Sequence, residues 1–347
     1  SAKEVTVMMT NRQKLIFKAI VDEFVATAEP VGSKLLMTKY QLPYSSATIR
    51  NDMQALEEMG YLEKTHTSSG RVPSTLGYRY YCENLMQNTR DESMDLMIRD
   101  IFANRRFNLE EAIQESCDIL SQMTNLTSGV LGPDARNQRL EHIRLFPVNA
   151  RTAVCVMITD TGHTENKTFV FDEDISIDDL QNTCDILNSR LKGTLIQDVG
   201  PKLESIKPIL AANVQRYEML FKAFVQAFMR FTSENVYFSG QGNMLYQPEF
   251  NDIEKLRSIM GLLQGSAVFK QIGDGTSHVS YVTREGSELT WFDDVAIVKS
   301  RFKVGDSEEG QLMVVGPSRM NYDRIVSTLE TMSAMLENLY GGKNGRR

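Results

Sequence analysis

Residues 45–60 read SSATIRNDMQALEEMG, and this stretch decides how the first part of the chain folds. A hydroxyl at Ser45 or Ser46 can accept a hydrogen bond from a nearby backbone N–H, as helix-capping residues do. Apolar side chains follow with the spacing of a helix that buries one face: Ile49, Met53 and Leu56. Gly60 suits the left-handed conformation that ends many helices. We therefore predict a helix from Ser45 or Ser46 to about Met59.

Two further helices are predicted before this one. Apolar residues at helical spacing follow Thr10, which forms a capping-box pattern with the glutamine three positions on, and this helix must end before Pro30. Ser33 is then the expected cap of a short helix from Lys34 to Tyr40. Only the four residues QLPY at 41–44 separate that helix from the next. Two helices joined by such a turn form a helix-turn-helix.

The segment after Gly60 predicts a hairpin with a polar tip. Residues 61–64 (YLEK) are expected to form a strand, and residues 65–73 (THTSSGRVP) carry polar side chains that suit a loop on a phosphate backbone. A further helix is predicted from Thr75, with tyrosines near its start that pack on the hairpin or on a partner subunit. Three helices and this hairpin predict a winged helix-turn-helix DNA-binding domain over residues 1–88.

The start of the third helix carries the side chains expected to recognise DNA, because a recognition helix brings its N-terminal residues to base edges in the major groove. Arg50 can pair bidentately with guanine and Asn51 with adenine. Lys34 and Arg71 are the expected electrostatic contacts to phosphates. The predicted DNA-binding residues are Ser33, Lys34, Ser45, Ser46, Thr48, Arg50, Asn51, Thr67, Ser69, Gly70 and Arg71.

A purely structural role is the alternative for these residues. Ser45 and Ser46 could serve only as caps, and Arg50 could pair with an acid on its own helix, Asp52 or Glu57. The order of helices and hairpin favours DNA binding, and so does the charge distribution. Residues 1–90 hold 11 Lys+Arg and 9 Asp+Glu, a balance of +2, in a chain of net charge −7. A mildly basic module on an acidic body suits a DNA-binding protein.

Beyond residue 88, the sequence predicts an α+β protein of more than one domain. Linker helices are expected within 88–135 and a final helix over 322–340. Strand patterns occur in a hairpin at 152–171 and again near 279–282, 295–298 and 311–315. A mostly helical block separates the two sets of strands. We therefore predict a sensor-like α/β domain formed by residues 89–200 and 270–347, and a mostly helical insertion at 201–269.

Two segments in this part of the chain allow alternative interpretations. The helix at 217–231 carries four phenylalanines that could form either a core or a dimer interface: Phe221, Phe224, Phe228 and Phe231. The turn GPSR at 316–319 could hold an anion at a helix start, but a tight turn with Ser318 as the cap is favoured.

Several classes of function lack support in the sequence. The four cysteines form no C-x-x-C pair, the four histidines have no metal-binding spacing, and no catalytic motif occurs. No apolar run reaches the ~18 residues of a membrane helix, and no signal segment opens the chain. We expect a cytoplasmic protein with reduced, buried thiols, with no metal or cofactor, and without enzymatic activity.

Several segments resemble the heat-inducible transcription repressor family, HrcA. The resemblance is dense in residues 10–86 and includes EPVGSK at 29–34, SSATIRNDM at 45–53, LEKTHTSSGR at 62–71 and GYRYY at 77–81. Later segments, QPEF at 247–250 and GPSRMNY at 316–322, also resemble the family.

The resemblance implies a winged-helix N-terminus and a GAF-like domain interrupted by an inserted dimerisation domain, here at 201–269. It implies a homodimer that binds the CIRCE inverted-repeat operator of bacterial chaperone operons (groE and dnaK type) and represses them until heat shock. It also implies that the GroEL chaperonin keeps the repressor active.

Other functions compatible with the sequence are a winged-helix repressor controlled by a small ligand in the GAF-like domain, an enzyme that uses that domain, and a winged helix that binds protein or RNA. The enzyme lacks a catalytic constellation. A filled apolar core in place of a cavity would argue against the ligand.

Overall fold

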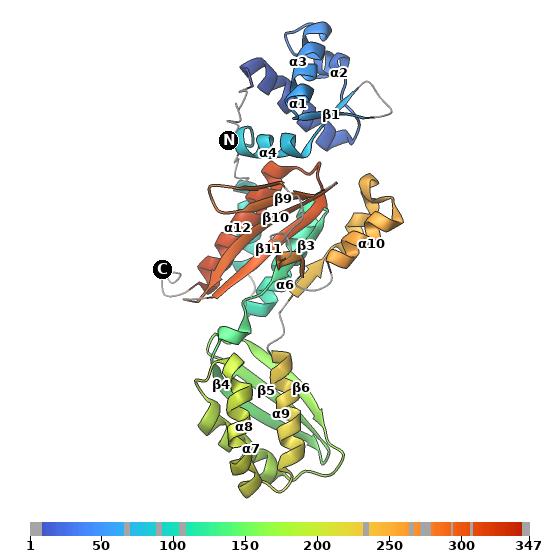
Figure 1. The fold of residues 1–347 in the computed structure, drawn as a ribbon. Coiled ribbons are helices and arrows are strands. Elements are labelled where there is room, and N and C mark those ends of the chain that lie inside the picture. Colours follow the sequence, from blue (N-terminus) through green and yellow to red (C-terminus); the bar gives the residue numbers. More distant parts are fainter. Residues whose placement is uncertain are drawn as a thin grey trace, which may run out of the picture.

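The computed structural model describes residues 9–65, 70–87, 92–103, 109–231, 236–263, 267–270, 279–292, 294–305 and 308–341. The fold is α+β, with helices packed on several sheets. Figure 1 shows an N-terminal unit, a central body and an outlying unit arranged along one long axis. Within the described residues, no helix combines the length and the apolar character needed to cross a membrane.

The N-terminal unit contains, in chain order, α1 (Asn11–Thr27), α2 (Ser33–Lys39), α3 (Ser46–Glu58), β1 (Leu62–Lys64), β2 (Arg71–Pro73) and α4 (Thr75–Asn84). The predicted capping box of α1 is confirmed, with Thr10 as cap and Gln13 as its partner. Ser45 caps α3 by accepting from the backbone N–H of Thr48 at 3.1 Å. Gly60 follows α3 with a φ of +82°, as predicted. Strands β1 and β2 pair antiparallel as the expected hairpin.

The predicted cap of α2 was wrong. The helix begins at Ser33 itself, and Gly32 occupies the cap position without a side-chain hydrogen bond. The Ser33 hydroxyl lies 2.9 Å from the Ser46 hydroxyl, so it joins α2 to α3. A partner across the turn therefore takes the hydroxyl that was expected to cap the helix.

The body is built on a six-stranded antiparallel sheet in the order β7-β3-β11-β10-β9-β8. Its strands are β3 (Thr127–Leu131), β7 (Val236–Ser239), β8 (Val279–Val282), β9 (Glu288–Phe292), β10 (Val295–Val304) and β11 (Glu308–Pro317). Helices α5 (Glu92–Ala103), α6 (Leu109–Thr124) and α12 (Tyr322–Tyr340) belong to one side. Alternate residues of the central strands therefore face α12, for example Leu312 and Val314.

The other face of this sheet is covered by the segment that follows β7. This segment contains η2 (Gln241–Tyr246), η3 (Pro248–Phe250), α10 (Ile253–Leu262) and α11 (Ala267–Lys270). Its buried side chains form one apolar core with the sheet residues Val295, Ile297, Met313 and Val315. The sequence predicted mostly helix for this region and missed β7, which pairs with β3. The sequence pattern did not indicate β7, because a four-residue strand is stabilised by pairing with a strand far away in the chain.

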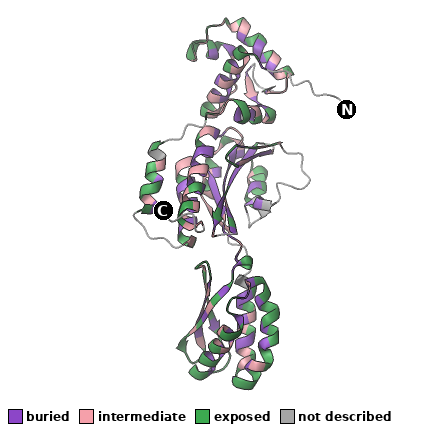
Figure 2. Ribbon diagram, turned by 90° about the vertical axis from the view of Figure 1, so that its left-hand side faces the viewer, coloured by how far each residue is buried: buried purple, intermediate pink, exposed green. Residues whose placement is uncertain are grey.

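The outlying unit has its own sheet and core. It contains η1 (Ala135–Asn137), β4 (Leu140–Asn149), β5 (Thr152–Thr159), β6 (Thr164–Val170), α7 (Ile177–Leu191), α8 (Ile196–Asn213) and α9 (Tyr217–Phe231). The predicted hairpin is confirmed as β5 and β6, with Gly162 at a φ of +85° in the turn. Figure 2 shows helices on one face of this sheet only. One core joins residues from Ala135 to Phe228, so it extends across the expected boundary at 200/201.

The phenylalanines of α9 belong to this core. Phe221, Phe224 and Phe228 are buried, and the Phe224 ring meets Phe169 of β6 edge-on at 5.2 Å between centroids. The side chain of Phe231 lies outside the described part. Of the two roles open for this helix, the structure supports the core.

The turn at 316–319 does not cap the final helix through Ser318. Instead, Asn321 accepts from the backbone N–H of Arg324 at 3.1 Å and caps α12. The helix therefore begins later than expected, and Ser318 uses its carbonyl to accept from the Tyr322 hydroxyl. The prediction of Ser318 as cap was wrong, because Asn321 directly precedes the first residue of α12 and its side chain reaches the backbone N–H of Arg324.

Candidate nucleic-acid interface

Helix α3 is held from its inner side. Ile49, Met53 and Leu56 are buried in the core of the N-terminal unit. Asp52 lies on the same side, and its carboxylate accepts from Arg12 of α1 through Nε at 2.6 Å and Nη2 at 3.2 Å. A bidentate guanidinium–carboxylate pair fixes direction as well as distance. The opposite side of α3 therefore faces away from the unit.

Arg50 and Asn51, the two predicted base-reading residues, are both exposed on that outer side. The acids considered as partners for Arg50 are engaged elsewhere, Asp52 with Arg12 and Glu57 with Arg71. Among the described residues, Arg50 makes no ion pair. Its guanidinium is thus available to an external acceptor, as a base-reading arginine requires.

The predicted hydroxyl residues cluster at the start of α3. The Ser45 hydroxyl contacts the Thr48 hydroxyl at 2.9 Å as well as capping the helix. The side chains of Ser33 and Ser46 meet each other, and Ser33 is buried. These contacts order the helix start, where backbone N–H groups and the helix dipole favour an anion. Lys34 is exposed one residue after Ser33.

The hairpin residues have structural partners. Gly70 is buried, and a Cβ there would come within 2.8 Å of the Pro30 backbone. Arg71 donates from Nε to Glu57 of α3 at 2.7 Å, and its backbone pairs with Val31. Arg71 therefore ties the hairpin to α3, and its contact with phosphate stays a prediction. Thr67 and Ser69 lie outside the described residues.

Sequence reasoning missed two groups that hold this surface. One is Arg12, whose partner lies 40 positions away. The other is Glu23, a buried acid that accepts from Lys39 Nζ at 2.6 Å and from the Tyr40 hydroxyl at 2.9 Å. The hydrogen bond from Lys39, aided by Tyr40, lowers the Glu23 pKa, despite burial. No local pattern indicates either contact, because each joins two separate helices.

Known proteins resemble this chain over most of its length. A crystal structure described only as that of a hypothetical protein has 20% identity, covers 96% of this chain and 99% of its own, and has a TM-score of 0.66, so the two share a fold. An IclR family transcriptional regulator from Brucella abortus has 12% identity and a TM-score of 0.21, with coverage of 97% and 95%.

The family model for the HrcA protein C terminal domain matches residues 110–326, which is more than half of the chain. The matched region contains the outlying unit and most of the body, and it includes the GPSRMNY segment at 316–322 that the sequence resemblance used. This chain therefore belongs to the HrcA family.

Proposed function

We propose that this chain is a homodimeric transcriptional repressor of the bacterial cytoplasm with no enzymatic activity. It binds the CIRCE inverted repeat upstream of groE- and dnaK-type chaperone operons through a winged helix-turn-helix in its first 88 residues. Heat shock relieves the repression, and the GroEL chaperonin maintains the active form. We assign the GAF-like domain to the body. The inserted dimerisation domain, which the sequence analysis expected at 201–269, is assigned instead to the outlying unit from η1 to α9, because one core spans that unit.

One observation carries the proposal: α3 presents Arg50 and Asn51 outward while Asp52 is held inward by Arg12. An arginine that is exposed beside a capped helix N-terminus is placed to contact a base edge or a phosphate. Arg50 can pair with guanine and Asn51 with adenine, each worth about 1–3 kcal/mol of discrimination. Membership of the HrcA family supports the identity of the operator.

A second copy is required because a helix-turn-helix protein reads an inverted repeat with two recognition helices. The outer face of the three-stranded sheet is suited to this contact, because no helix of its own unit covers it (Figure 2). That face carries apolar side chains at half-buried or exposed positions, including Phe146, Val148, Val154, Val156, Ile158 and Val170. An apolar face without a cover favours association with an identical face.

The alternative of a small ligand in the GAF-like domain finds less support. On the face of the body sheet that the segment after β7 covers, the apolar side chains of Met244, Phe250, Ile259 and Phe269 pack against the strands. A face filled by side chains offers little room for a metabolite.

A salt-dependent binding titration tests the proposal. The DNAs are a CIRCE-type inverted repeat and a control with one half-site scrambled. Tight binding to the intact repeat, weak binding to the control and a steep salt slope are expected. Equal, weak binding to both, unchanged by GroEL and ATP, would contradict the proposal.

A further inference from the structure

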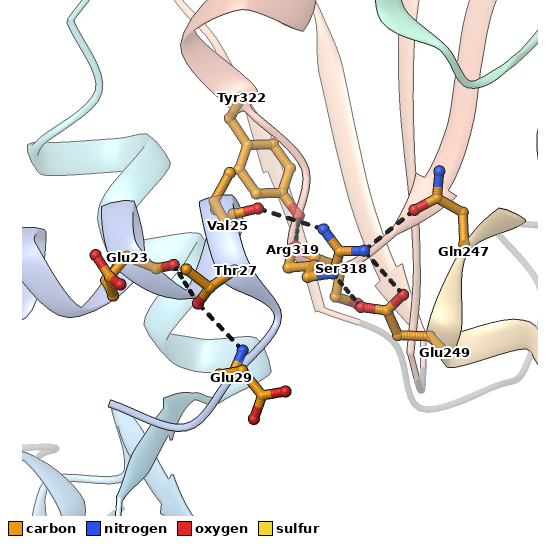
Figure 3. Close-up of polar contacts among 9 residues, drawn as sticks. All are labelled: Glu23, Val25, Thr27, Glu29, Gln247, Glu249, Ser318, Arg319 and Tyr322. Carbon is orange, nitrogen blue, oxygen red and sulfur yellow. Dashed lines mark hydrogen bonds and ion pairs between the residues drawn. The ribbon is translucent and has the colours of Figure 1, made fainter. Parts of the chain in front are cut away.

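Arg319 joins three segments that lie far apart in the sequence. It follows β11, and its side chain is 16% exposed. Its Nε and Nη2 donate to the carboxylate of Glu249, and Nη2 also donates to Gln247 Oε1 at 3.2 Å. Its Nη1 donates to the backbone carbonyl of Val25 in α1 at 3.3 Å. Figure 3 shows the guanidinium between these groups.

The contact with Val25 supplies what the end of α1 lacks. The last carbonyls of a helix have no partner within the helix, and a cation near them is favoured by the helix dipole. The last turn of α1 contains no basic residue. Arg319 therefore provides, from the body, the cationic donor for a helix of the N-terminal unit.

Other contacts also join this unit to the body, since buried residues of both belong to one hydrophobic core and α4 lies against β8. The Tyr81 hydroxyl donates to Asp323 at 2.7 Å, and the Tyr78 ring lies 5.8 Å from the Tyr322 ring. Among the described residues, the buried Tyr78 hydroxyl has no hydrogen-bond partner. A cavity of ≈ 330 Å³ lies between α1 and the start of α12. Apolar packing is not directional, so the directed polar contacts at this interface fix the relative orientation of the two parts.

The position of α1 determines the position of the recognition surface, since Arg12 fixes α1 to α3 through Asp52. The separation and direction of two recognition helices must match the spacing of the half-sites. We propose that Arg319 is the positioning residue that sets the orientation of the N-terminal unit on the body, held by Glu249 and bonded to the end of α1. The consequence for operator binding rests on the function proposed above.

Arginine is needed for this role, because it must satisfy two sets of acceptors at once. The planar guanidinium pairs with the Glu249 carboxylate and still directs Nη1 at Val25. A lysine carries the charge but cannot bond both groups in fixed directions. Arg319→Lys should therefore restore part of what Arg319→Gln loses.

A distance measurement without DNA tests the orientation directly. Spin labels are attached at Gln54→Cys on α3 and Asn338→Cys on α12, both exposed positions, in a Cys184→Ser background diluted with unlabelled protein. We expect a narrow distance distribution for Arg319, a broad one for Arg319→Gln and an intermediate one for Arg319→Lys. Lys255→Gln, which removes an exposed ion pair within the body, is the control and should change nothing. An unchanged distribution for Arg319→Gln would overturn the proposal.

Operator binding provides the second readout. For Arg319→Gln, affinity for the preferred half-site spacing should fall about tenfold, the size of a typical coupling between sites, while affinity for an isolated half-site stays constant. Glu249→Gln should act in the same direction, and it replaces Arg319→Gln if that variant fails to fold. Equal losses on repeat and half-site would overturn the positioning role. If the unmodified protein prefers no repeat, the proposed function fails, and the distance measurement still decides the role of Arg319.

Discussion

The guanidinium of Arg12 holds the carboxylate of Asp52 in a bidentate contact of 2.6 and 3.2 Å. This pair joins the first and third helices, and it occupies the acid that stands two positions after Arg50. A structural contact on one side of α3 thus leaves the charged side chain on the other side available. The Arg12–Asp52 pair therefore stabilises the packing of α1 on α3 and also keeps Asp52 from pairing with Arg50.

Replacing Arg50 with alanine should reduce operator affinity by about 1–3 kcal/mol and relax the preference at one base position. The reason is the loss of a bidentate contact to a base, with the helix itself unchanged. Competition titrations with operators altered at single positions measure this. Arg190→Ala, an exposed arginine on α7, is the matched control. An equal loss for all sequences would mean that Arg50 contacts phosphate.

Lys34→Ala should weaken binding to every DNA sequence alike. An exposed lysine near the start of α3 contacts phosphates, so its loss should lower the salt-dependence slope by about one. Titrations at several salt concentrations with specific and unrelated DNA provide the measurement. A change confined to one operator position would place Lys34 at a base edge instead.

Gly77→Ala should destabilise the N-terminal unit by about 1–3 kcal/mol or more, as overpacking does. A Cβ at Gly77 would lie 2.2 Å from the backbone carbonyl oxygen of Tyr61. Gly200→Ala in α8 is the control, because its Cβ would meet nothing within 4 Å. That variant should be neutral or gain up to about 1 kcal/mol. Thermal unfolding of both variants distinguishes the two sites; similar midpoints would contradict the close approach.

Val156→Asp should convert the proposed dimer to monomer. The side chain lies on the outer face of the three-stranded sheet, where two copies would place two carboxylates in an apolar contact. Ser189→Asp on α7, exposed on the helical side, serves as control. Sedimentation at micromolar concentration reports the mass. A dimer that survives Val156→Asp would place the interface elsewhere.

The cysteine thiols should react slowly with a disulfide reagent at pH 8. Burial raises the pKa of Cys184 to about 11 and that of Cys117 to about 12, and it raises the pKa values of Cys82 and Cys155 as well. The reactive thiolate is scarce below a raised pKa, so the rate should increase as pH rises towards 11. Cys184, which is half-buried, should react first. Fast labelling of Cys117 at pH 8 would contradict its burial.

Local signals in the sequence predicted local features. Ser45, Gly60 and the spacing of the apolar residues in α3 act within a few positions, and each was confirmed. Contacts between distant segments were not predictable: the pairing of β7 with β3 and the bond from Arg319 to Val25 have no signature within a sequence window. For the candidate site, the sequence predicted Arg50 as a base contact, and the structure places its side chain at the surface. The contact between Arg71 and Glu57 was not predictable, because it depends on how the hairpin packs against α3.

The position of β3 has a consequence for synthesis of the chain. Val130 of β3 lies opposite Leu312 of β11, so the central sheet cannot close until nearly all residues have left the ribosome. The N-terminal unit and the outlying unit have local partners and can fold earlier. Such non-local pairing is slow and leaves apolar strands exposed to aggregation during translation. A protease pulse on ribosome-bound chains that end before residue 308 should cut the body strands and spare the first unit.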